Sequence, residues 1–130
     1  MAMMRMVLAM IALVWALPAM AQPVRVADLR AQAMAGDMAA VGESLARHQA
    51  AFVAGDIDSD QARAPYALFH TTHPQIIAFT DDWLAARPAS PYALTARAWV
   101  LNRMGWLVRG EKSGRDTHPQ AFAEHRAMHA

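Results

Sequence analysis

The sequence predicts an all-α protein in which antiparallel helix pairs stack as a short solenoid. Three observations favour this fold class. Apolar residues recur at helical spacing along most of the chain, and capping residues, prolines and glycines mark the ends of these stretches. No run alternates apolar and polar β-branched residues, as a half-buried strand would. The tetrad Thr-His-Pro-Gln occurs twice, at Thr72 and Thr117, which indicates a repeated helical unit.

The first 21 residues have the pattern of a secretory signal peptide. Arg5 supplies a positive charge, an apolar stretch runs from Val7 to Leu17, and Ala19 and Ala21 are the small residues before a cut at Gln22. The apolar stretch is shorter than the roughly 20 residues that span a bilayer, although an uncleaved anchor remains the alternative. We therefore expect an exported protein, periplasmic or secreted, with one helical domain over residues 22–130 and no stable membrane insertion after cleavage.

Composition excludes several classes of function. The chain has 130 residues, is 55% hydrophobic and 18% charged, and is therefore typical of a folded domain. It contains no cysteine, which excludes disulfides, cysteine-ligated metal centres and thiol catalysis. A formal net charge of +1 provides no basic excess, so we expect no nucleic-acid partner.

The first half of the chain predicts a helical hairpin followed by a shorter helix. One helix is expected over residues 24–35, ending at Gly36, and a second begins with Asp37 as its N-cap and ends at Gly55. The acidic connector over residues 56–60 lacks the glycine and the distant glutamate of a calcium loop, so we interpret it as helix-capping. A short helix follows over residues 59–69, with Pro65 inside it.

The second half predicts a second hairpin and a final helix. Thr72 is the expected N-cap of a helix that ends before Pro88, and Ser90 that of a helix reaching Arg109. Thr117 opens the last helix, which extends to about residue 129. In the helix that begins after Ser90, the aromatic residues Tyr92, Trp99 and Trp106 recur every seven residues. We expect Trp83, Trp99 and Trp106 to belong to the packed core, and we expect arginine side chains of this helix to stack on the aromatic rings. A ligand groove lined by these aromatic side chains is the alternative.

The histidines of the last helix are the candidate metal ligands. His125 and His129 are four residues apart, which places them on one face of a helix, and His118 precedes His125 by seven. This spacing suits zinc or copper, but the glutamate of the metalloprotease pattern is missing between the pair. The sequence thus predicts no cofactor, and a small metal-binding protein using these histidines remains an alternative.

An enzyme is the other alternative class. A hydrolase would need His70, His73 and Asp81 or Asp82 to meet, which only tertiary structure could bring about, since neighbouring helical carboxylates point about 100° apart. Residues 110–115 resemble a phosphate-binding loop in composition only, because the glycine spacing is wrong.

The second hairpin carries a resemblance to a known family. The segments that carry it are Trp83-Leu-Ala-Ala-Arg-Pro88, Ser90-Pro91-Tyr92-Ala93, Ala98-Trp99 and Arg109-Gly110. Together they resemble an uncharacterised bacterial family of tetratricopeptide-like helical proteins. The likeness covers residues 27–127, and the specific motifs lie between Trp83 and Gly110. It implies a tetratricopeptide-like solenoid and no particular reaction, and it implies that this chain is a short or truncated member.

These observations favour a binding or scaffolding module of the cell envelope, since stacked helix pairs expose a concave surface to proteins or peptides. The candidate binding residues are Tyr92, Phe122, His125 and Met128. The last three lie on the final helix, which we expect to expose an apolar strip for a protein partner or for self-association, weakened below about pH 6.5 as the histidines gain charge.

Overall fold

The structure is a computed structural model that describes residues 23–110 and 115–130. The predicted signal peptide and most of the phosphate-loop-like segment lie outside the described residues. The described residues are helical and contain no strand, which confirms the all-α class. The elements are α2 (Val26–Met34), α3 (Met38–Val53), α4 (Ser59–Arg63), the 3-10 helix η1 (Ala64–Phe69), α5 (Pro74–Ala86), α6 (Pro91–Arg109) and α7 (Pro119–Ala127).

Two helix starts follow the predicted capping chemistry. The Asp37 carboxylate accepts a hydrogen bond from the Ala40 amide at 3.0 Å, and the Ser90 hydroxyl accepts one from the Ala93 amide at 3.3 Å. Each side chain thereby satisfies one of the amides that the first turn of a helix leaves without a partner.

The other two predicted N-caps are wrong by one residue. The residue before Pro74 is His73 and the residue before Pro119 is His118, and these are the N-caps of α5 and α7 in place of Thr72 and Thr117. Each proline occupies the first helical position, and it holds the residue before it in the extended region. His118 uses its ring for this role, because Nδ1 accepts a hydrogen bond from the Gln120 amide at 3.2 Å.

The segment after α3 changes from α to 3-10 geometry where the sequence predicted one short helix. Asp58 and Gln61 form a capping box at the start of α4, and Pro65, which has no amide hydrogen, follows within η1. The buried His48 connects α3 to this segment, because its Nε2 lies 2.8 Å from the Gln61 carbonyl oxygen.

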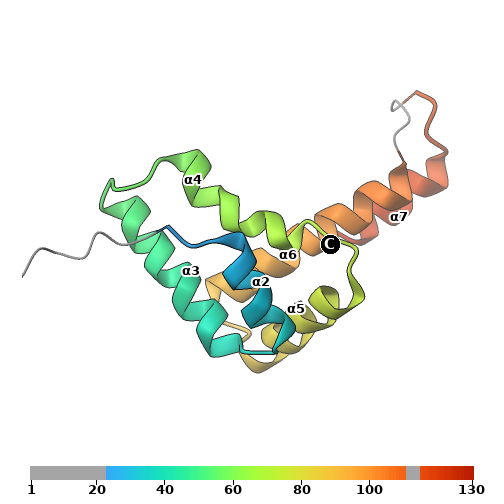
Figure 1. Ribbon diagram of the computed structural model, residues 1–130. Coiled ribbons are helices and arrows are strands. Elements are labelled where there is room, and N and C mark those ends of the chain that lie inside the picture. Colours follow the sequence, from blue (N-terminus) through green and yellow to red (C-terminus); the bar gives the residue numbers. More distant parts are fainter. Residues whose placement is uncertain (1–22, 111–114) are drawn as a thin grey trace, which may run out of the picture.

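Two helical hairpins pack against each other to form the body of the protein (Figure 1). The α2–α3 hairpin turns at Gly36, whose φ of 73° is accessible to glycine at little cost. In the packing of the hairpins α2 contacts α5 and α3 contacts α6, while η1 fits against α2 and α6. A further link joins the hairpins, because the Gln75 side-chain amide donates to the Met34 carbonyl at 3.0 Å. The core comprises Leu29, Ala33, Val41, Leu45, Leu68, Phe69, Ile76, Phe79, Trp83, Ala93, Ala96 and Val100.

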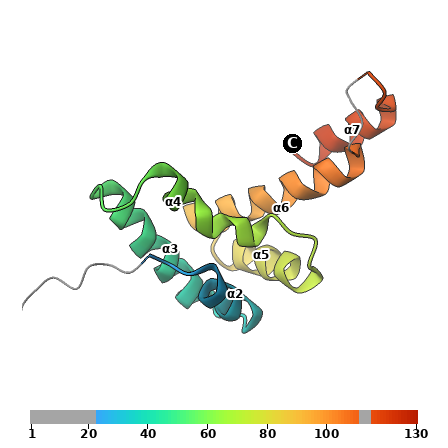
Figure 2. The ribbon, with the colours of Figure 1, turned by 45° about the horizontal axis from the view of Figure 1, so that its top comes forward.

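The end of α6 extends beyond the body and carries α7. Figures 1 and 2 both show α7 lying beside the second half of α6, away from α2 and α3. α6 has 19 residues and its partner α5 has 13, so α5 is too short to cover all of α6. We call the part of α6 from Leu101 onward, together with α7, the α6–α7 arm. Of the helices in the described residues, none is both long and apolar enough to cross a membrane.

The sequence predicted that Trp83, Trp99 and Trp106 all belong to the packed core, but the structure places them in three different environments. Trp83 is 2% exposed and belongs to the core, whereas Trp99 is half-buried and packs against its edge. Trp106 is 45% exposed and lies in the arm, so its assignment to the core is wrong. The predicted stacking of an arginine on a ring is confirmed at this position, because the Arg109 guanidinium carbon lies 4.5 Å from the centre of the Trp106 ring.

We expect Ser90→Ala to lower the free energy of unfolding by about 1 kcal/mol, the usual effect of removing a serine N-cap. Denaturant unfolding of the variant checks this. Ser59→Ala is the control, because Ser59 is exposed in the first turn of α4, where Asp58 is the cap. Equal effects of the two substitutions would contradict the capping role of Ser90.

Candidate functional site

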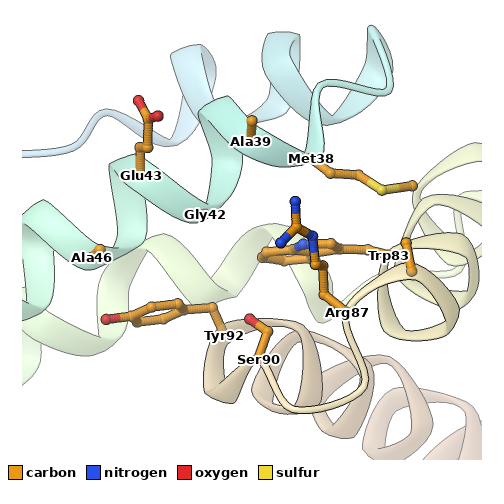
Figure 3. A pocket seen from close by; sticks show the side chains of 10 residues that line it. Met38, Ala39, Gly42, Glu43, Ala46, Trp83, Arg87, Ser90 and Tyr92 are labelled. Carbon is orange, nitrogen blue, oxygen red and sulfur yellow. The ribbon is translucent and has the colours of Figure 1, made fainter.

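A groove lies between α3 and the α5–α6 turn (Figure 3). It has a volume of about 610 Å³. The side chains of Trp83, Arg87 and Tyr92 extend into the space between α3 and the start of α6. The lining residues are Met38, Ala39, Gly42, Glu43, Ala46, Trp83, Ala86, Arg87, Ser90 and Tyr92.

The apolar floor of the groove depends on a glycine inside α3. A Cβ atom placed on Gly42 would lie 3.7 Å from Cζ2 of Trp83, so the indole is in contact distance of the helix backbone. The other side of the indole is supported by Phe79, whose ring centre lies 5.5 Å from that of Trp83. Because these two rings belong to the core, the groove is formed by a rigid part of the molecule.

The groove is also lined by polar side chains, which include a guanidinium, a carboxylate and two hydroxyl groups. Arg87, the C-cap of α5, is exposed, and none of the described residues forms an ion pair with it. Ser90 and Tyr92 contribute hydroxyl groups from the start of α6. Glu43 lies on α3 with its carboxylate turned away from Arg87 and Tyr92 (Figure 3). The groove thus combines aromatic surface with a guanidinium that is free to bind a carboxylate.

The phenol of Tyr66 lies close to the Tyr92 end of the groove. Burial of Tyr66 raises its pKa above the usual value of 10.0, and the proximity of Tyr92 raises this pKa further. Both effects disfavour the phenolate in the folded state.

We therefore expect the protein to lose stability in alkali. A raised pKa in the folded state gives a stabilisation that is complete below pH 10 and is lost as the pH rises through the pKa of Tyr66. The measurement is denaturant unfolding at pH 8 and at pH 11. Tyr66→Phe should reduce the fall in stability between these values, and an unchanged fall would contradict the assignment to Tyr66.

The second cluster of side chains lies between the two helices of the arm. The ring of His125 packs edge-on against Trp106, with ring centres 5.8 Å apart, and against His129, with ring centres 4.7 Å apart. Both histidines lie over Gly105, which is buried. A Cβ atom on Gly105 would come within 2.7 Å of His125 Nδ1 and 2.9 Å of His129 Nε2. A side chain at this position would therefore displace the two imidazole rings from the α6 backbone.

The structure separates the three candidate metal ligands. His125 and His129 come together over α6, while His118 caps the other end of α7 through its Nδ1. No group of three or more histidine, aspartate or glutamate side chains in the described residues could hold a metal ion.

The residues named for a hydrolase are not brought together. His70 packs edge-on against Trp99, with ring centres 5.9 Å apart, and Asp81 forms an ion pair with Arg97 at 2.8 Å. His73 is the N-cap of α5, and Asp81 lies eight residues further along, which is about 12 Å at the rise of an α-helix.

The candidate binding residues fall into two places. Tyr92 lines the groove, whereas Phe122, His125 and Met128 are half-buried in the arm. Arg109 lies over the Phe122 ring at 5.8 Å, so at least part of the predicted apolar strip is used in the contact between α7 and α6.

Three residues that shape these sites were not singled out from the sequence, namely Gly42, Arg87 and Gly105. Gly42 and Gly105 are isolated glycines inside helical patterns, and this pattern can indicate that another element packs closely against the helix backbone. Arg87 gave no such signal, because its role depends on the packing of α3 against the α5–α6 turn.

Comparisons with models of protein families, with curated proteins and with solved structures found no match to this chain.

Proposed function

We propose that this chain is an exported peptide-binding module whose helix pairs stack in the manner of a short tetratricopeptide-like solenoid. The groove between α3 and the α5–α6 turn is its binding site, and the ligand is a peptide segment in which an apolar side chain adjoins a carboxylate. The leader pattern supports export, and the contacts of α2 with α5 and of α3 with α6 support the stacking.

The observation that carries the binding proposal is the combination of the half-buried Tyr92 ring and the exposed Arg87 guanidinium in one groove. Binding sites for small ligands are usually concave and apolar, with few polar groups that fix orientation. The half-buried side chains of Met38 and Tyr92 offer apolar surface to a ligand side chain, next to the buried Trp83 indole. Arg87 offers a planar fork of donors to a carboxylate, and hydrogen bonds to charged groups are stronger than neutral ones.

Fluorescence anisotropy with labelled hexapeptides tests the proposal. The peptides carry leucine or phenylalanine next to aspartate, and a matched set carries asparagine in its place. We expect the aspartate peptides to bind more tightly by about tenfold or more, the range for a hydrogen bond to a charged group. Arg87→Gln should remove this preference, and Gly42→Leu should weaken both sets because the new side chain fills the groove.

Arg30→Gln is the matched control, because Arg30 is an exposed arginine on α2 that does not line the groove. Binding that is equally affected by Arg30→Gln and Arg87→Gln, or that survives Gly42→Leu unchanged, would place the ligand elsewhere. Absence of binding by every peptide at millimolar concentration would overturn the proposal.

A further inference from the structure

Exposed apolar side chains form two pairs in the described residues. Phe52 and Val53 lie at the end of α3, where Val53 is 76% exposed, and Trp106 and Leu107 lie in the arm, where Leu107 is 53% exposed. Figures 1 and 2 both show the turn between α3 and α4 and the arm at opposite ends of the molecule. Adjoining apolar side chains on the surface are typical of sites that bind another protein.

The apolar pair at the end of α3 is followed by acidic side chains. Asp56, Asp58 and Asp60 come within seven residues of Val53, and all three are exposed. The Asp58 carboxylate caps α4 and Asp60 pairs with Arg63, whereas Asp56 forms no ion pair with any described residue. We call this surface the acidic corner, and it consists of Phe52, Val53, Asp56, Asp58 and Asp60.

The apolar pair in the arm is accompanied by arginines. α6 contains three arginines and no acidic residue. Arg103 precedes Trp106 by three residues and Leu107 by four, which places the three side chains on one face of the helix. Arg103 forms no ion pair within the described part of the chain, and the Arg109 guanidinium lies over the Trp106 ring. We call this surface the basic face, and it consists of Arg103, Trp106, Leu107 and Arg109.

The difference in charge extends beyond the two surfaces. Residues 23–90 contain eight acidic residues and five arginines, a formal charge of −3, whereas residues 91–130 contain three acidic and six basic residues, a formal charge of +3. The two surfaces of one copy lie at opposite ends and do not meet, but the surfaces of two copies attract each other. Two arms repel each other, which disfavours a symmetric contact between them.

From these observations we propose that copies of this chain associate head to tail, with the basic face of one copy against the acidic corner of the next. The apolar pair of the arm packs on Phe52 and Val53, and Arg103 lies beside Asp56. Such a contact joins two different surfaces, so every pair of copies still has one free arm and one free corner. Association therefore continues into rings or open chains. The proposal does not rest on peptide binding in the groove.

Sedimentation velocity of the purified protein tests the association. We expect the average mass to rise with protein concentration, from micromolar to millimolar, in about 50 mM salt. The mass should return toward that of the monomer in about 500 mM salt, because ions screen the attraction between exposed charges.

Two variants each impair one surface. Val53→Arg places a cation in the acidic corner, and Leu107→Asn removes an apolar side chain from the basic face. Each should weaken the association by about tenfold or more, the effect of losing a central interface residue. Leu94→Asn is the matched control, because Leu94 is a leucine of α6 with a similar exposure of 49% that lies outside both surfaces. Circular dichroism checks that each variant keeps its helices.

A mixture of the two variants separates head-to-tail association from a symmetric contact. The arm of the Val53→Arg copy and the corner of the Leu107→Asn copy are both intact, so we expect pairs of unlike copies that grow no further. Association of Val53→Arg at wild-type strength would overturn the proposal, as would equal weakening by Leu94→Asn. A wild-type protein that stays monomeric in low salt would also overturn it, including the case in which the arm binds vesicles of anionic lipid instead.

Discussion

Trp83→Ala should lower the free energy of unfolding by about 3–5 kcal/mol, the usual range for truncating a buried tryptophan. The substitution removes the contact with the α3 backbone at Gly42 and the ring contact with Phe79, so it leaves a cavity where two hairpins meet. A domain of this size has a stability of about 5–15 kcal/mol. We expect the melting temperature to fall by roughly 10 °C or more, as measured by circular dichroism.

Trp106→Ala is the matched control for this prediction. It removes the same side chain from the exposed surface of the arm, where it contacts Arg109 and His125. We expect a loss of about 1 kcal/mol at most, the value of an exposed cation–π contact. A comparable loss of stability in the two variants would show that Trp83 is not the side chain that joins the hairpins.

Gly105→Leu should detach α7 from α6 while the body stays folded. Even a single Cβ atom at this position would approach His125 Nδ1 to 2.7 Å, and the longer leucine would displace both histidine rings. α7 has nine residues, and a helix of this length is unstable in water without tertiary contacts. Hydrogen exchange measured on residues 119–127 should therefore become fast, with unchanged protection in α2, α3 and α5.

Gly42→Ala is the glycine control for this experiment. Its Cβ atom would meet Trp83 at the ordinary contact distance of 3.7 Å, and alanine favours a helix over glycine by about 1 kcal/mol. We expect stability to be equal or slightly higher and α7 to remain protected. Unchanged exchange in α7 of Gly105→Leu would mean that α7 is held by contacts other than those over Gly105.

Local signals in the sequence were sufficient for the helices and for part of the core. Asp37 and Ser90 could be assigned as caps because capping chemistry acts within three residues. The N-caps of α5 and α7 are His73 and His118, one residue after the predicted Thr72 and Thr117. In both cases the restriction that proline imposes on its predecessor decided the helix start.

The burial of the tryptophans could be predicted only in part. The seven-residue spacing of Trp99 and Trp106 gives the face of α6 on which they lie, but it does not give the length of the neighbouring helix. α5 is too short to extend along α6 as far as Trp106, and α7 covers that part of α6 only partly. Of the aromatic residues named for a ligand groove, Trp83 and Tyr92 line the observed groove. Its other residues could not be predicted, because Gly42 and Arg87 are 45 residues apart and meet only through tertiary packing.

The length of α6 has a mechanical consequence. Its 19 residues form a continuous rod of about 28 Å, which begins at the groove with Tyr92 and ends in the arm with Arg109. Ala93, Ala96 and Val100 belong to the core, so the first half of this rod is fixed in the body of the protein. The unbroken helix therefore sets the distance at which α7 lies from the groove.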